Sequence, residues 1–159
     1  MVRVQRHTLA EVRSPKLEAA LKRWYQLCGS GGLYPRDDLG FGVLIGSPEI
    51  MNGRSAVVAT DVDDPLNFVV AFYGGEFNVY ENKSLVARRF RDFPDRGPAE
   101  AMVRCYLEAI SERQPTAHRI AGSFGGVDLT YDRLILPTIN KDGVVDRLVT
   151  LSEEVSREL

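Results

Sequence analysis

Cysteine and histidine are scarce in this chain, with 2 of each among 159 residues. Cys28 and Cys105 form neither a Cys-x-x-Cys pair nor the dense pattern of a secreted disulfide scaffold, so we expect a reduced, cytoplasmic protein. No second histidine or cysteine stands at ligand spacing from His118, and His7 lies in the N-terminal stretch. These absences argue against a disulfide framework and against a metal site.

An excess of positive charge is also missing. Lysine plus arginine number 20 against 22 for aspartate plus glutamate, which gives a formal net charge of -2. A chain with this balance has no basic excess with which to neutralise phosphates or anionic lipids. We therefore expect no nucleic-acid partner.

Long apolar runs are absent as well. No stretch approaches the roughly 18 apolar residues of a membrane-spanning helix, so no membrane span is expected. Residues 1–12 mix charged side chains with isolated apolar ones and lack the apolar centre of a signal peptide. Both observations again favour a cytoplasmic protein.

The chain does contain enough apolar material for one core. Hydrophobic residues make up 44% of its 159 residues, which fits a single globular domain. We expect that domain to cover residues 14–153, between a loose N-terminal arm at 1–13 and a charged tail at 154–159. The tail is compatible with a helix and could be the start of a dimerisation helix.

Two stretches predict amphipathic helices. Ser14 and Pro15 make a good helix start, and apolar residues then recur at helical spacing, so the first helix should cover residues 14–28. Trp24 lies on that apolar stripe and should belong to the core rather than to a ligand platform. Residues 98–113 carry a second apolar stripe bounded by a proline on each side, which predicts a long helix.

Other stretches predict strands. Residues 56–73 hold two β-branched and aromatic runs separated by turn residues, which predicts a hairpin. Residues 117–151 hold three such runs separated by two glycine-containing turns, which predicts a three-stranded meander. Residues 39–55 and 74–97 mix apolar, glycine and turn residues and predict only short helical turns and loops.

The turn at Gly125-Gly126 predicts the register of the first meander hairpin. If the turn has two residues, Ile120 pairs with Tyr131 and His118 pairs with Arg133. These residues then share one face of the sheet. His118 and Arg133 would lie at the far end of an otherwise apolar inner face.

The opposite face of the same hairpin carries Arg119 across from Asp132, a pair suited to solvent or to a partner. Leu134 and Leu136 fall on this face too, which indicates either a bulge or a cover over part of it. Ser123 also lies there, away from His118, and the chain has no Gly-x-Ser-x-Gly motif. We therefore expect no serine nucleophile.

Four stretches resemble the small stand-alone bacterial PAS family, and the match covers about residues 17–153. The stretches are LKRWYQLCGSGGLYPRDDL at 21–39, FVVAFYG at 68–74, VYENKSLVARRFRDFP at 79–94 and YDRLILP at 131–137, followed by a last strand at 144–151. The resemblance implies an α+β fold in which helices cover one face of a five-stranded antiparallel sheet, here with an added N-terminal helix. The chain departs from the family at Glu81, Val86 and Ala87, where the family tends to have glycine.

The resemblance also bears on cofactors. The LOV-type flavin motif has its reactive cysteine between asparagine and arginine, whereas Cys105 stands in VRCYLE on the predicted long helix. A haem-type PAS domain has its axial histidine on that helix, and residues 98–114 contain none. Neither chromophore is expected, and the resemblance leaves any cofactor unknown.

For function, the resemblance implies a sensory or regulatory domain that signals through non-covalent protein contact. It would bind a small molecule or a partner protein between sheet and helices, and we expect a homodimer. The candidate ligand-binding residues combine an apolar wall with a few polar tips; they are Tyr73, Phe77, Tyr80, Met102, Tyr106, His118, Tyr131 and Arg133. Arg133 together with His118 would favour an acidic ligand.

Two alternatives belong to other classes of protein. The first is a small enzyme on a similar α+β cone, with His118 as general base and Tyr131 as an electrophilic donor. It requires an open, water-lined cavity at His118. The second is an interaction scaffold without a ligand, in which the candidate residues are ordinary core. We expect no catalytic residue.

Overall fold

The computed structural model describes residues 2–27, 34–35, 48, 54–73 and 88–158. The helices are α1 (Pro15–Leu27) and α4 (Arg96–Glu112), with short 3-10 helices at Leu9–Glu11, Pro65–Asn67 and Phe90–Asp92. The strands are β1 (Arg3–His7), β2 (Tyr34–Pro35), β3 (Arg54–Ala59), β4 (Val69–Tyr73), β5 (Thr116–Phe124), β6 (Val127–Ile139) and β7 (Val145–Glu158). Phe77 and Tyr80 lie outside the described residues, as does most of the predicted loop sequence around them.

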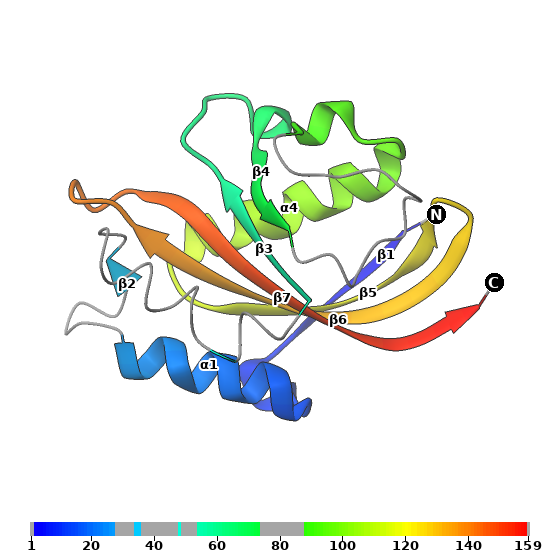
Figure 1. The fold of residues 1–159 in the computed structure, drawn as a ribbon, viewed down its shortest axis with the longest axis horizontal. Coiled ribbons are helices and arrows are strands. Elements are labelled where there is room, and N and C mark those ends of the chain that lie inside the picture. Colours follow the sequence, from blue (N-terminus) through cyan, green and yellow to red (C-terminus); the bar gives the residue numbers. More distant parts are fainter. Residues whose placement is uncertain (1, 28–33, 36–47, 49–53, 74–87, 159) are drawn as a thin grey trace.

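One sheet runs through the molecule in the strand order β1-β5-β6-β7-β3-β4, with antiparallel neighbours (Figure 1). The short β2 pairs with β6 in parallel. The predicted hairpin is β3 with β4, and the predicted meander is β5, β6 and β7. The α+β fold class, with the antiparallel hairpin and meander of the expected PAS-like sheet, is therefore confirmed, and among the described residues β1 and β2 extend the expected five strands to seven.

Both ends of the described chain are strands. In place of a loose arm, residues 3–7 form β1 and pair with β5 from Arg3 opposite Ala121 to His7 opposite Ala117. In place of a helix-compatible tail, β7 continues to Glu158 along β6. These polar ends form strands because they pair with a neighbouring strand. Their own residue types therefore do not predict a strand.

The register of the β5–β6 hairpin is the predicted one. Gly125 and Gly126 have φ angles of 59° and 85°, the left-handed geometry that a two-residue hairpin turn requires. Ile120 then pairs with Tyr131, and the ladder continues without a shift to Thr116 opposite Ile135. The prediction held because two glycines fix the turn and the side-chain period of a strand fixes the rest.

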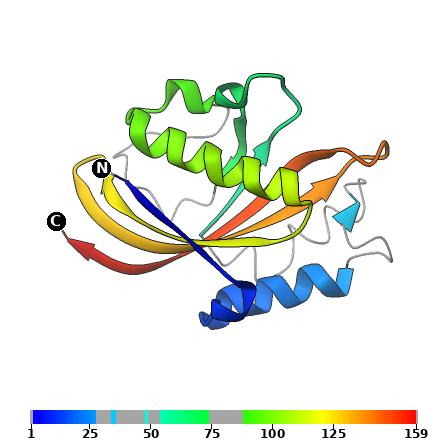
Figure 2. The ribbon, with the colours of Figure 1, turned by 180° about the vertical axis from the view of Figure 1, so that it is seen from behind.

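A helix covers each face of the sheet (Figures 1 and 2). Helix α4 packs on what we call the inner face, in a core that includes Val58, Tyr106, Ile120, Tyr131 and Leu148. Helix α1 packs on the outer face, where its buried residues Leu17, Ala20 and Trp24 meet Leu134, Leu136, Val149 and Leu151. The two leucines on the predicted polar face are therefore explained by a covering helix, and the hairpin contains no bulge there.

The helix boundaries follow local chemistry. Ser14 caps α1, since its Oγ accepts a hydrogen bond from the Leu17 amide at 3.4 Å. Helix α4 begins at Arg96, two residues before the predicted start, and ends at Glu112, where the C-cap residue Arg113 takes the left-handed conformation at φ 56°. The Arg113 guanidinium donates to the Gly143 carbonyl at 3.0 Å, which ties this helix end to the β6–β7 turn. Within the described ranges, no helix combines the length and apolar character needed to cross a membrane.

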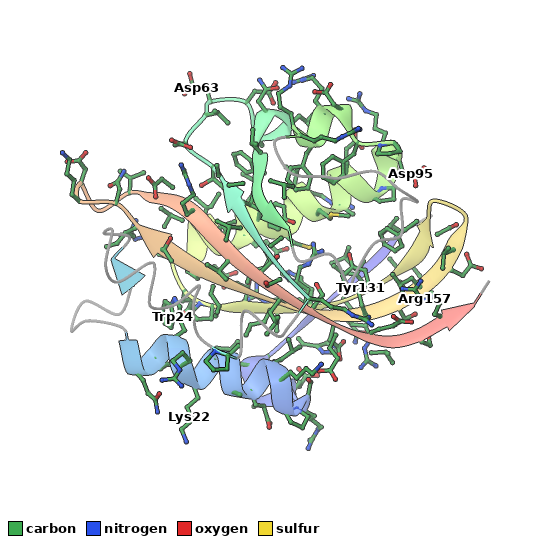
Figure 3. The ribbon with its side chains drawn as sticks, in the orientation of Figure 1. Lys22, Trp24, Asp63, Asp95, Tyr131 and Arg157 are labelled. Carbon is green, nitrogen blue, oxygen red and sulfur yellow. The ribbon has the colours of Figure 1, made fainter. Side chains whose placement is uncertain are left out.

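Trp24 joins α1 to the sheet, as Figure 3 shows, and it is fully buried. Its indole Nε1 donates to the Pro137 carbonyl at 3.1 Å. Replacing Trp24 by Phe removes buried volume and leaves that carbonyl without its donor, so the free energy of unfolding should fall by about 2 kcal/mol. Urea unfolding followed by circular dichroism measures the change, because the chain has 1 tryptophan and fluorescence would lose its reporter.

Tyr25→Phe is the matched control. Tyr25 is 53% exposed, and a phenylalanine at this position keeps the ring contact with Trp24. It should change the free energy of unfolding by less than about 0.5 kcal/mol. An equally small loss for Trp24→Phe would contradict the role assigned to the α1 contact.

Candidate ligand-binding site

A row of polar side chains crosses the inner face at right angles to the strands. The register pairs Arg6 of β1 with His118 of β5, His118 with Arg133 of β6, Arg133 with Ser152 of β7, and Ser152 with Arg54 of β3. Register partners point to the same side of a sheet. We call these five residues the inner-face row.

Arg133 stands at the centre of the inner-face row and is buried, with 7% of its surface exposed. Its guanidinium carbon lies 5.1 Å from the ring centre of Tyr131 and 5.8 Å from that of Tyr106. Its Nη1 donates to the Tyr106 hydroxyl and its Nε to the Ser152 hydroxyl, both at 3.3 Å. A guanidinium this far from water needs such polar and aromatic partners, and these two hydrogen bonds are long.

Tyr106 is the helical partner of Arg133. Burial raises the pKa of its phenol, while the positive charge of Arg133 opposes that change. The hydroxyl therefore stays protonated at neutral pH. Figure 3 shows Tyr131 on the side of the sheet that faces α4.

His118 is the next residue of the inner-face row, and its side chain has no exposed surface. Burial lowers its pKa below the usual 6.5, and the hydrogen bond to Glu108 opposes that change without reversing it. The imidazole Nε2 lies 2.8 Å from Glu108 Oε2. Since a carboxylate only accepts, we assign the proton of the neutral ring to Nε2.

This assignment changes what His118 can contribute. Its Nδ1 is buried and has no hydrogen-bond partner among the described residues. At neutral pH the residue therefore adds a hydrogen-bonding ring beside Arg133 rather than a second positive charge. The charge that favours an acid belongs to Arg133.

Glu108 ties this site to α4 and β1. The same oxygen that meets His118 also accepts from Arg6 Nη1 at 3.1 Å. Arg6 reaches Glu112, one turn further along α4, at 2.6 Å and 3.1 Å. At the other end of the inner-face row, Arg54 pairs with Glu154 at 2.7 Å.

The structure brings five of the predicted residues together. Met102, Tyr106 and Tyr131 belong to the inner core, and His118 and Arg133 lie in the adjoining row. Tyr73 ends β4, two strands from β7 in the sheet order, and its side chain lies outside the description, as do Phe77 and Tyr80. The placement of those three in a pocket stays a prediction.

Sequence reasoning missed several residues in and around the inner-face row. Ser152 could have been found by carrying the register from β6 to β7, and Glu108 by noting that it follows the buried Cys105 by one helical turn. Arg6 gave no signal, because its place depends on β1 forming a strand. Phe90 and Phe93 line the same core, with ring centres 4.4 Å apart and Phe90 edge-on to Tyr106. They lie in a segment predicted to form short helical turns and loops, and residues 90–92 form such a turn.

Two hollows open elsewhere on the described surface. One of about 340 Å³ lies beside Arg3, Ser123 and Thr130, and another of about 450 Å³ lies between residues 9–12 and α1. Arg133 and His118 line neither of them. Among the described residues, no group of three or more His, Cys, Asp or Glu side chains is arranged to hold a metal ion.

The enzyme alternative needs an open, water-lined cavity at His118. The described structure gives this imidazole no exposed surface and engages its Nε2 with Glu108. Tyr131, the residue expected to act as donor, is also fully buried. This geometry does not provide the open cavity that a general base at His118 requires.

No family model and no curated protein matches this chain. Among solved structures, a similar chain is the ligand-binding domain of the amino acid chemoreceptor PctC of Pseudomonas aeruginosa PAO1 in complex with GABA. The two are 11% identical with a TM-score of 0.41, and the match covers 86% of this chain and 53% of that chain. This chain thus spans about half the length of that receptor domain. A likeness at this level carries no conclusion about ligand or activity.

The buried, neutral His118 predicts that mild acid destabilises the protein. The folded state holds the pKa below 6.5, so the unfolded chain takes up the proton first as the pH falls. The free energy of unfolding should therefore decrease as the pH falls below about 6.5. Urea unfolding between about pH 7.5 and about pH 5.5 measures this slope, and His118→Gln should make it shallower.

The chosen range separates His118 from the carboxylates. Hydrogen bonds lower the pKa values of Glu11, Glu112 and Glu154 from 4.5, so these carboxylates titrate below the chosen range. His7→Gln is the control for removing a histidine elsewhere in the chain. An unchanged slope in His118→Gln would contradict the assignment of a buried neutral imidazole.

Proposed function

We propose that this protein is a PAS-like sensory or regulatory domain that binds a small acidic molecule between the inner face of its sheet and α4. Binding changes the surface that it offers to a partner protein, and the signal passes by non-covalent contact. The observation that carries the proposal is the buried Arg133 guanidinium on the covered face of the sheet.

The chemistry of Arg133 supports an acid as ligand. A guanidinium offers its donors in a planar fork that matches a carboxylate in two parallel hydrogen bonds. Two of its protein partners, the hydroxyls of Tyr106 and Ser152, are neutral and stand at 3.3 Å. A carboxylate at a shorter distance is a stronger partner for the same groups, since a charge-assisted hydrogen bond is roughly twice as strong as a neutral one.

The aromatic surroundings support a small organic acid rather than an inorganic anion. Tyr106, Tyr131, Phe90, Phe93 and Met102 form the apolar part of the neighbourhood, and all are buried. A pocket of mostly apolar walls with a few polar tips is typical of small-molecule sites. His118 adds a ring of fixed tautomer beside the guanidinium.

The wider expectations from the sequence belong to this proposal too. The protein would act in the cytoplasm, as a homodimer, with its output through a separate partner protein. Size-exclusion chromatography with light scattering determines the oligomeric state directly.

The test has two steps. Native mass spectrometry of freshly purified protein looks for a co-purified acid, and calorimetry at pH 7 then measures binding of acetate, succinate and benzoate. Arg133→Gln should weaken binding by about 10- to 100-fold, because it removes a charged hydrogen-bonding partner of the carboxylate. Arg133→Lys keeps the charge without the planar fork, so it should retain part of the affinity.

Arg119→Gln is the matched control. It removes the same charge from the adjacent position of the same hairpin, but Arg119 lies on the outer face and pairs with Asp132 at 2.8 Å. It should bind acids as the wild-type protein does. If no acid binds or co-purifies, or if the Arg119 and Arg133 variants lose affinity equally, the sensing proposal is wrong and a ligand-free scaffold is favoured.

A further inference from the structure

Glu108 connects the candidate site to the edge of the sheet through a single oxygen atom. Its Oε2 lies 2.8 Å from His118 Nε2 and 3.1 Å from Arg6 Nη1. We propose that the chain of contacts from His118 through Glu108 to Arg6 couples the site to β1, so that binding of an acid loosens β1 and makes it the output strand. This inference rests on the proposed function.

β1 is suited to such a role because little else fastens it. It is an edge strand, paired with β5 alone among the described strands, and its burial pattern shows four exposed residues followed by one that is half-buried. Few of its side chains bury apolar surface, and segments of this kind open at low free energy. The guanidinium of Arg6 is therefore a substantial part of its attachment to α4.

The two carboxylates that hold Arg6 are not equivalent. Glu108 and Glu112 lie one helical turn apart on α4, and both accept hydrogen bonds from Arg6. Glu108 alone of the two also forms a hydrogen bond with His118, the register partner of both Arg6 and Arg133. A change at the site thus reaches Arg6 through Glu108, while Glu112 contributes only to the attachment.

The sign of the coupling follows from charge. A carboxylate bound at Arg133 places a second negative charge near Glu108, and like charges disfavour each other in a partly buried region. The bound acid also offers His118 a competing partner. Both effects make the observed position of Glu108 less favourable, and the oxygen that holds Arg6 moves with it. By linkage, loss of the Glu108 charge should strengthen acid binding.

Hydrogen–deuterium exchange of the full-length protein at pH 7 tests the coupling. The readout is the exchange of those amides in residues 3–7 that are protected in the wild-type protein. The probe is the tightest-binding of acetate, succinate and benzoate. Saturation with this acid should speed their exchange by about threefold, the scale of one exposed ion pair.

Two matched variants separate coupling from attachment. Glu112→Gln should speed exchange in residues 3–7 and keep the acid response, because Glu108 still joins Arg6 to His118. Glu108→Gln should speed exchange, lose the acid response and bind the acid about threefold more tightly. Arg6→Gln gives a second route to the same readout: fast exchange that the acid leaves unchanged.

The outcomes distinguish this inference from the proposed function. If the acid binds and exchange in residues 3–7 does not change, the coupling is wrong and the sensing function stands. The coupling is also wrong if Glu112→Gln and Glu108→Gln respond to the acid alike. If none of the three acids binds to the wild-type protein, the proposed function and the coupling are both wrong.

Discussion

The buried guanidinium of Arg133, on the covered face of the sheet, limits which groups can pack around it. Arg133 is buried, so its charge has to be met by protein groups or by a ligand rather than by water. The sheet register places His118 on one side of it and Ser152 on the other, and α4 supplies Tyr106 from above. The sheet register sets the members of the inner-face row, and Arg133 lies at its centre.

The two faces of the sheet have different environments and different roles. The outer face under α1 is an apolar core in which Trp24 meets Leu134 and Leu136. The packing of α1 on that side stabilises the sheet. The inner face under α4 combines aromatic residues with the polar row, and it is the side on which chemistry is possible. A period of two along each strand is enough to keep these two environments apart.

The sequence predicted those parts of the fold whose signal is local. Gly125 and Gly126 specify a hairpin turn, so the pairing of His118 with Arg133 could be written down before any coordinates. β1 could not, because its polar residues become a strand only by pairing with β5. For the same reason the sequence did not predict the place of Arg6 or its connection to His118 through Glu108. Met102, Tyr106 and Tyr131 lie in the inner core, since apolar and aromatic residues follow the face of their element, and their role in ligand binding stays a prediction.

The family resemblance implied the α+β architecture and a sensory role, and we propose Arg133 as the residue that binds the ligand. The most direct measurement is an NMR titration of arginine-labelled protein at pH 7, in which the Arg133 Nε–H signal is identified by its loss in Arg133→Lys. The account predicts that a small carboxylate shifts this signal saturably and leaves the outer-face Arg119 signal in place. An Arg133 signal that does not respond to any carboxylate, or that shifts only as much as Arg119, would contradict it.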